Sequence, residues 1–402
     1  MTDELSLQKV THEELLDLCE RNIENGLSVF IEGGIGIGKS DTAELLARRQ
    51  AAKMKRKFVC FEDLLDHERE ELVNSQEARE KVYIFVIYDL LTKAPEDGAG
   101  IPVPRNGYID WMPPCSIRIM TQPGAAGLMF LDEFLQAPQS VQKPYADLFL
   151  NGRIAERRIM PEVGVIGASN LAEDKCGTTQ MLDHMDNRTA HYELLTPTAK
   201  KWVSWCQEQE RNLGMKDEEG KSIPFVDPRI LMFIMSCPDQ LYVPKRGDRK
   251  RKGFPSPRVW RRVSPVIRTV NEETDKMLFL HILAGWVGNG ATAKFKGVLD
   301  HNMAEEGPKI LDDPELFRSA KWDRQVAFSM WMSNHSRNDS KFMHRSCRFL
   351  NSLGRSPMFD TMVYMMKSNV GKTFITACSG GRYPVVREVL LEMGLQLKED
   401  AE

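Results

Sequence analysis

The chain lacks the paired cysteines of a metal site or a disulfide framework. Its eight cysteines stand singly, with no CxxC pair and no cluster of histidines near them. This spacing speaks against both structural zinc and a disulfide-stapled fold. Unpaired thiols in a chain of this size are typical of a reducing compartment. We therefore predict no structural metal of the zinc-finger kind.

Long hydrophobic runs and a strong net charge are also missing. The longest apolar runs, such as residues 82–88, are far shorter than the ~20 residues of a membrane-spanning helix, and the first residues are acidic and polar rather than signal-like. We expect a cytoplasmic protein without a membrane partner. The formal charge of −3 gives the whole molecule no strong attraction for nucleic acid. Such a partner would need a local basic patch.

The length and composition are those of a globular protein with more than one domain. At 402 residues the chain is about the length of two or three compact units of ~150 residues. The composition, 42% hydrophobic and 28% charged with no low-complexity tract, is ordinary for such proteins. We predict an α/β domain over residues 1–200, a helical domain over 201–300 and a helical extension over 301–402.

Short apolar runs alternate with helical or loop segments over the first 200 residues. Helical spacing covers residues 10–25, and strong helix formers follow from residue 41 to about 57. The pattern predicts a mostly parallel sheet flanked by helices. The predicted strands are residues 28–32, 82–88, 128–131, 163–168 and 191–195.

After residue 200 the pattern is helical. Polar stretches rich in Gly, Pro and charge at residues 214–226 and 243–257 are read as loops. The many Met and aromatic residues of 312–402 are read as a helical core rather than a cofactor site. The predicted helices before that tail are residues 198–212, 227–236, 258–272 and 275–299.

A glycine-rich stretch, GGIGIGKS at residues 33–40, follows a predicted strand and opens a predicted helix. It fits G-x-x-x-x-G-K-[ST], the phosphate-binding loop. Glycines let backbone N–H groups converge on phosphates, Lys39 places a cation on the β and γ oxygens, and Ser40 offers a hydroxyl to magnesium. We predict an ATP site with Mg2+. Its predicted nucleotide-binding residues are Gly33, Gly34, Ile35, Gly36, Ile37, Gly38, Lys39, Ser40 and Asp41.

Two carboxylates follow the strand predicted at residues 128–131. Asp132 and Glu133 would lie at its carboxyl end, where ligands of open α/β sheets bind. Asp132 is predicted to hold magnesium with Ser40, and Glu133 to polarise the attacking water. An apolar strand that ends in Asp-Glu is common, and about one such end in two is a solvated turn without a catalytic role. The phosphate-binding loop makes the catalytic interpretation the better one.

Two further side chains stand at strand ends. Asn170 follows the strand predicted at residues 163–168, near the expected γ-phosphate, although Asn after a strand is usually a turn residue. Arg188 precedes the last predicted strand and is placed to reach the nucleotide of a neighbouring subunit. The plainer interpretation of Arg188 is a surface salt bridge.

The order of these motifs resembles the AAA+ ATPases, in particular their MoxR-like branch among bacterial and phage proteins. The resemblance covers about residues 20–300. It departs from the family pattern at EDGAGIP, residues 96–102, and at DEFLQAP, where a DEINRAP-like form is more usual. The matching blocks are GGIGIGKS, GIPVPRNGYIDWMPP at 100–114, GLMFLDEFLQAP at 127–138, VIGASN at 165–170, DNR at 186–188 and SPRVW at 256–260.

The resemblance implies roles for three residues and a ring assembly. It gives Asn170 a sensor 1 role, Arg188 the role of an arginine finger acting in trans, and Arg258 a sensor 2 role in a helical lid. It implies a homo-oligomeric ring, a hexamer, in the host cytoplasm if a phage encodes the chain. Residues 98–126 would be the family insert and 151–162 a hairpin, both facing the pore or a client.

Three functions remain open at this point. The first is a chaperone-like ATPase that remodels or activates a protein partner, such as one with a von Willebrand factor A domain by family analogy. The second is a nucleic-acid loader or motor that uses the basic run KRGDRKRKG at residues 245–253. That run lacks interleaved aromatics for base stacking. The third is a nucleotide-gated switch, which an intact Glu133 disfavours.

Overall fold

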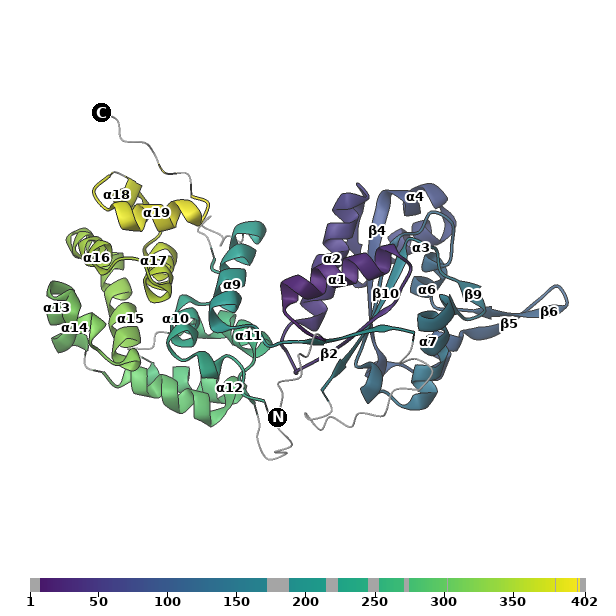
Figure 1. The fold of residues 1–402 in the computed structure, drawn as a ribbon, viewed down its shortest axis with the longest axis horizontal. Coiled ribbons are helices and arrows are strands. Elements are labelled where there is room, and N and C mark those ends of the chain that lie inside the picture. The colour runs from purple at the N-terminus through teal and green to yellow at the C-terminus, as the bar shows by residue number, and fades with distance from the viewer. Residues whose placement is uncertain are drawn as a thin grey trace. The chain divides into compact units, whose positions relative to one another are not determined.

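The computed structural model describes residues 8–171, 188–214, 223–244, 253–270, 275–301, 303–379, 381–395 and 397 (Figure 1). The chain divides into two compact units, Met1–Thr196 and Pro197–Glu402. Among the described residues, no helix is long and apolar enough to cross a membrane. The predicted boundary at residue 300 between a lid and an extension stays a prediction.

Unit 1 is built on a seven-stranded sheet in which each adjacent pair of strands runs parallel. The strand order is β1-β11-β2-β10-β7-β4-β3. All five predicted strands are present, and β1 and β3 are additional. The strands are β1 (Lys9–Val10), β2 (Val29–Gly33), β3 (Lys57–Cys60), β4 (Val82–Asp89), β7 (Gly127–Asp132), β10 (Val163–Asn170) and β11 (Ala190–Leu194).

Helices flank this sheet. The first begins at a capping box in which the Thr11 hydroxyl accepts from the Glu14 N–H and the Glu14 carboxylate accepts from the Thr11 N–H. The second ends at Lys53, earlier than predicted, because the chain turns at Lys55 into β3. The helical elements are α1 (His12–Glu24), α2 (Lys39–Lys53), α3 (Asp66–Asn74), α4 (Gln76–Lys81), α5 (Pro95–Ala99), α6 (Cys115–Met120) and α7 (Gln139–Asn151), with 3-10 turns η1 (Phe61–Asp63), η2 (Leu90–Thr92) and η3 (Phe134–Gln136).

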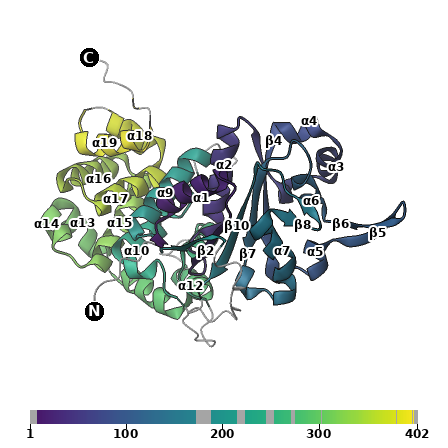
Figure 2. The ribbon, with the colours of Figure 1, turned by 45° about the vertical axis from the view of Figure 1, so that its right-hand side comes forward.

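Two antiparallel hairpins interrupt the pattern of strand and helix. One is formed by β5 (Ile101–Arg105) and β6 (Tyr108–Met112), and it extends away from the rest of unit 1 (Figure 2). The other, β8 (Arg153–Ile154) with β9 (Arg157–Arg158), is the hairpin predicted within residues 151–162. Arg157 Nη2 donates to Asp110 Oδ1 at 2.7 Å and so ties the two hairpins together.

Unit 2 is helical in its described part. The helix predicted to end at residue 272 ends at Ile267, and α12 has a non-helical residue, Gly288, inside it. The helical elements are α9 (Ala199–Leu213), α10 (Pro228–Ser236), η5 (Pro238–Gln240), α11 (Pro257–Ile267), α12 (Lys276–Leu299), α13 (Met303–Asp312), α14 (Pro314–Arg318), α15 (Trp322–Asn338), α16 (Ser340–Leu353), α17 (Pro357–Val370), α18 (Lys372–Ser379) and α19 (Pro384–Glu392).

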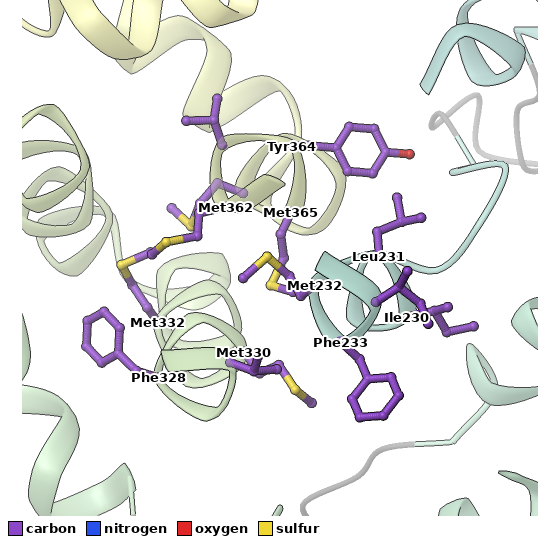
Figure 3. Packing of buried hydrophobic residues seen from close by; sticks show 14 of the residues in the cluster. Ile230, Leu231, Met232, Phe233, Phe328, Met330, Met332, Met362, Tyr364 and Met365 are labelled. Atoms are coloured by element: carbon purple, nitrogen blue, oxygen red, sulfur yellow. The ribbon is translucent and has the colours of Figure 1, made fainter. Parts of the chain in front are cut away.

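One hydrophobic cluster forms the core of unit 2. Methionines from three helices, among them Met232, Met330 and Met365, meet there (Figure 3). The cluster continues across residue 300, because Val298 and Met303 both belong to it. The predicted role of the Met-rich tail as helical core is confirmed. The predicted architecture is also confirmed: a parallel sheet flanked by helices, followed by helical segments.

Candidate nucleotide-binding site

The glycine-rich loop connects the carboxyl end of β2 to the first turn of α2. Gly36 and Gly38 have φ angles of 74° and 108°, in the left-handed region that glycine adopts without steric cost. A Cβ atom on Gly38 would also lie 3.3 Å from His12 Nε2. The loop therefore presents the amino end of a 15-residue helix, where free N–H groups and the helix dipole favour an anion.

Lys39 points back over this loop. Its ammonium donates to Gly33 O at 2.8 Å, to Gly34 O at 3.1 Å and to Asn170 Oδ1 at 2.9 Å. The residue is only 6% exposed. These three acceptors are neutral oxygens, so they do not cancel the charge of the ammonium. The position fits the phosphate-binding role predicted for Lys39.

Ser40 and Asp132 lie next to each other at the same edge of the sheet. Ser40 Oγ donates to Asp132 Oδ2 at 3.2 Å, and Asp132 Oδ1 accepts from the Glu133 N–H at 3.0 Å. Hydroxyl and carboxylate oxygens are the donors that Mg2+ prefers, and Mg2+ usually takes only one or two protein ligands beside phosphates and water. This pair fits magnesium. Within the described residues, no cluster of three or more His, Cys, Asp or Glu side chains offers another metal site.

Glu133 directly follows β7 with a backbone conformation that is rare for a residue with a side chain. Its φ of 55° and ψ of 33° lie in the left-handed region. Its Oε2 accepts from Asn170 Nδ2 at 2.6 Å. Burial raises the pKa of the Glu133 carboxyl, and the hydrogen bond from Asn170 opposes that rise. A carboxyl with a raised pKa beside a phosphate site suits a group that accepts a proton from water.

Three predicted residues therefore form one hydrogen-bonded row. Lys39 contacts one amide atom of Asn170, and Glu133 contacts the other. They come from α2, β10 and the end of β7, because parallel strands deliver their carboxyl ends to one edge of the sheet. The structure thus brings together Lys39, Ser40, Asp132, Glu133 and Asn170.

The two predicted arginines lie elsewhere. Arg188 is exposed and stands two residues before β11, which runs parallel to β2 with Ala190 opposite Val29. Arg188 therefore lies where the strands begin, whereas the glycine-rich loop of the same chain lies where they end. Arg258 is exposed near the start of α11 and belongs to unit 2. Asn187 and most of the basic run, residues 245–252, lie outside the described residues.

The structure adds two residues that the motifs do not predict. His12 Nε2 is hydrogen-bonded to Ile37 O at 2.9 Å, which fixes the loop from the first turn of α1. Gln136 is 8% exposed, and its amide lies 2.8 Å from Ser169 Oγ. The only sequence signal for Gln136 is its place in DEFLQAP, where the chain departs from the family form.

No protein-family model and no curated protein sequence matches the chain. Solved structures with a weak likeness to this chain include a mutant of RuvB from Thermotoga maritima, at 12% identity and a TM-score of 0.33, covering 71% of this chain and 73% of that one. NtrX of Brucella abortus has 14% identity and a TM-score of 0.30, over 74% and 66%. ORC2 of Aeropyrum pernix has 13% identity and a TM-score of 0.31, over 96% and 85%. No activity follows from likenesses of this size.

Proposed function

We propose that the chain is a Mg-ATP-hydrolysing AAA+ ATPase of the MoxR-like type that works as a homo-oligomeric ring. The observation that supports this most directly is the row from Lys39 through Asn170 to Glu133 at the carboxyl edge of a parallel sheet. In this row the Lys39 ammonium, which would bind phosphate, and the Glu133 carboxylate, which would activate water, lie on either side of the Asn170 amide. Positioning and charge are what phosphoryl transfer needs from a protein.

Each residue of the site has a part in the proposed reaction. Lys39 would bind the β and γ oxygens, and Ser40 and Asp132 would hold Mg2+, which would supply positive charge beside the phosphates. Glu133 accepts a proton from the water whose oxygen attacks the γ-phosphorus. The bond between that phosphorus and the bridging β oxygen breaks, and ADP leaves with the electron pair. Asn170 orients Glu133 and the transferred group.

The place of Arg188 supports a ring. An exposed arginine at the opposite edge of the sheet cannot reach the phosphate loop of its own chain. In a ring it would meet the nucleotide of a neighbour, so that hydrolysis in one subunit depends on the next one. We propose a hexamer, with Arg188 as the finger in trans and Arg258 as a sensor in the helical unit.

A protein client fits the exposed surface of the β5–β6 hairpin. Ile101, Tyr108 and Ile109 are more than 60% exposed there, and large apolar side chains on a protruding hairpin are typical of protein contacts. We propose that the ring remodels or activates a protein, one with a von Willebrand factor A domain by analogy. The alternative is a nucleic-acid partner, favoured by the exposed Arg153 and Arg158 of the second hairpin.

Affinity capture tests the client class. A Glu133→Gln bait with ATP is expected to hold the client on the ring, and mass spectrometry names it. Lys39→Ala is the matched bait, because it removes nucleotide binding from the same chain. A protein retained by Glu133→Gln and absent from Lys39→Ala supports remodelling. ATPase stimulation by DNA or RNA that falls as salt rises, with no protein retained, would support the alternative instead.

A further inference from the structure

Gln136 and Glu133 come from the same tight turn. The Gln136 N–H donates to Glu133 O at 3.1 Å within η3, which begins directly after Glu133. Both side chains therefore leave one short, rigid piece of backbone. Glu133 itself is held in the left-handed region. This turn fixes where the Glu133 side chain starts but leaves its carboxylate free to rotate.

The Gln136 amide is enclosed by three groups whose chemistry sets its orientation. Its oxygen accepts from the Asn170 N–H at 3.1 Å, and its nitrogen donates to Ser169 Oγ at 2.8 Å and to Glu133 Oε2 at 3.1 Å. The opposite orientation would set the amide oxygen against the carboxylate, and an ionised carboxylate can only accept. Gln136 thus links the tip of β10 to the proposed water-activating carboxylate.

Two amide nitrogens converge on a single oxygen of Glu133. Asn170 Nδ2 and Gln136 Nε2 both reach Oε2. Among the described residues no hydrogen bond to the other oxygen, Oε1, competes with water. Both donors are neutral, so they hold the carboxylate and leave its negative charge in place. A lysine or arginine at the same position would cancel that charge. The oxygen left to accept a proton is then always the same one.

We infer that Gln136 is a positioning residue that locks the Glu133 carboxylate so that Oε1 faces the attacking water. The inference rests on the proposed ATPase function. In this role Gln136 contacts Glu133 and the tip of β10 and does not contact the nucleotide. The competing role is purely structural, a buried amide that joins η3 to β10. A structural role would act on folding and on nucleotide affinity, not on the transition state alone.

The test compares Gln136→Met, which keeps the volume but removes the amide, with Gln142→Met. Gln142 is a fully buried amide on α7 whose nitrogen donates to Ala137 O at 2.8 Å. Fluorescently labelled ADP is titrated with Mg2+, alone and with aluminium fluoride, which mimics the transferring phosphoryl group. Gln136→Met is expected to weaken the aluminium fluoride complex about tenfold and ADP alone less than twofold, as expected for an interaction made in the transition state. Its kcat should fall about tenfold with little change in KM.

The double variant with Glu133→Gln gives the decisive comparison. If Gln136 acts through Glu133, the tenfold effect on aluminium fluoride shrinks to less than twofold in that background. An effect that persists there in full, or one of equal size in Gln142→Met, overturns the inference. If Gln136→Met does not fold, Gln136→Leu serves, since it also removes both amide atoms and keeps a side chain of similar size. If the wild type hydrolyses ATP, Glu133→Gln does not, and Gln136→Met hydrolyses it at the wild-type rate, the inference about Gln136 is overturned and the proposed function stands. If the wild type hydrolyses no ATP, the proposed function is overturned.

Discussion

The ammonium of Lys39 lies 2.9 Å from Oδ1 of Asn170, a residue 131 positions further along the chain. The other amide atom of Asn170 lies 2.6 Å from Glu133 Oε2. One side chain thus touches both the cation that would bind phosphate and the carboxylate that would activate water. If nucleotide binding moves the Lys39 ammonium, Asn170 would move with it and so change the position of the Glu133 carboxylate.

Lys39→Ala is expected to abolish nucleotide binding, because the cation over the loop is lost while the loop backbone remains. Binding of a fluorescent ATP analogue measures this. The control is Lys53→Ala at the other end of α2, where an exposed lysine pairs with Glu20 and Glu24 on the protein surface. Surface pairs of this kind contribute little, so Lys53→Ala should bind nucleotide as the wild type does. Equal binding by the wild type and Lys39→Ala would remove the phosphate role.

Asn170→Ala is expected to keep nucleotide binding and to slow hydrolysis. It removes one oriented donor beside the reacting groups, and loss of one such donor typically costs about 10²- to 10³-fold in kcat. Steady-state kinetics separate kcat from KM. Asn151→Ala, at the exposed end of α7, removes an amide whose bond among the described residues is to Asp147 in the same helix, and it should leave kcat unchanged. A loss of binding as severe as that of Lys39→Ala would contradict the assignment.

The parts of the candidate site that lie in continuous sequence motifs were predictable from the sequence. The loop at residues 33–40 and the pair Asp132 and Glu133 each stand in one continuous segment, with strand and helix signals beside them. The five main strands were predictable for the same reason, since buried parallel strands are continuous apolar runs. The two-residue β1 carries no such run, and β3 has only the short run at residues 58–60, directly after a predicted helix. These strands pair with β11 and β4.

Contacts across the sheet were not predictable from one sequence. Gln136 is a plain polar residue until folding sets it between Glu133 and Ser169. His12 meets Ile37 only because α1 packs beside the loop. The break at Gly288 inside α12, by contrast, has a local signal, because Gly288, Asn289 and Gly290 form a glycine-rich stretch within the predicted helix. Local patterns fix elements and motifs, while tertiary packing decides these partners.

Glu133→Gln is expected to bind ATP without turning it over and to hold the chain as an ATP-bound ring. The amide keeps the size of the side chain but cannot accept a proton from water. Size-exclusion chromatography with light scattering in ATP should show a large assembly. The same variant with the Lys39→Ala change should not assemble in ATP. A monomer under all nucleotide conditions would contradict the ring.

Lys367→Met is expected to destabilise unit 2 by about 3 kcal/mol, because removal of one partner leaves a buried charge uncompensated, which typically costs about 3–5 kcal/mol. The charge is that of Glu210, only 5% exposed, which is held by Lys367 at 3.1 Å and by the Tyr364 hydroxyl. Denaturant unfolding followed by tryptophan fluorescence reports this unit, since every tryptophan except Trp111 belongs to it.

Two variants complete this stability test. Lys372→Met, at an exposed lysine, should change stability by less than about 0.5 kcal/mol. The double variant Glu210→Gln with Lys367→Met should recover part of the loss, because it removes the buried charge as well. A Lys367→Met chain as stable as Lys372→Met would show that the pair contributes nothing.

Phosphate release from ATP by the full chain tests the central claim most directly. We predict steady release by the wild type in Mg2+, loss of release when EDTA removes the metal, and loss of release in Glu133→Gln while labelled ATP still binds. The second result ties the chemistry to a divalent metal, which Ser40 and Asp132 are proposed to hold, and the last ties it to Glu133. Wild-type chain that binds ATP with Mg2+ and releases no phosphate, or Glu133→Gln that releases it at the wild-type rate, would contradict the account.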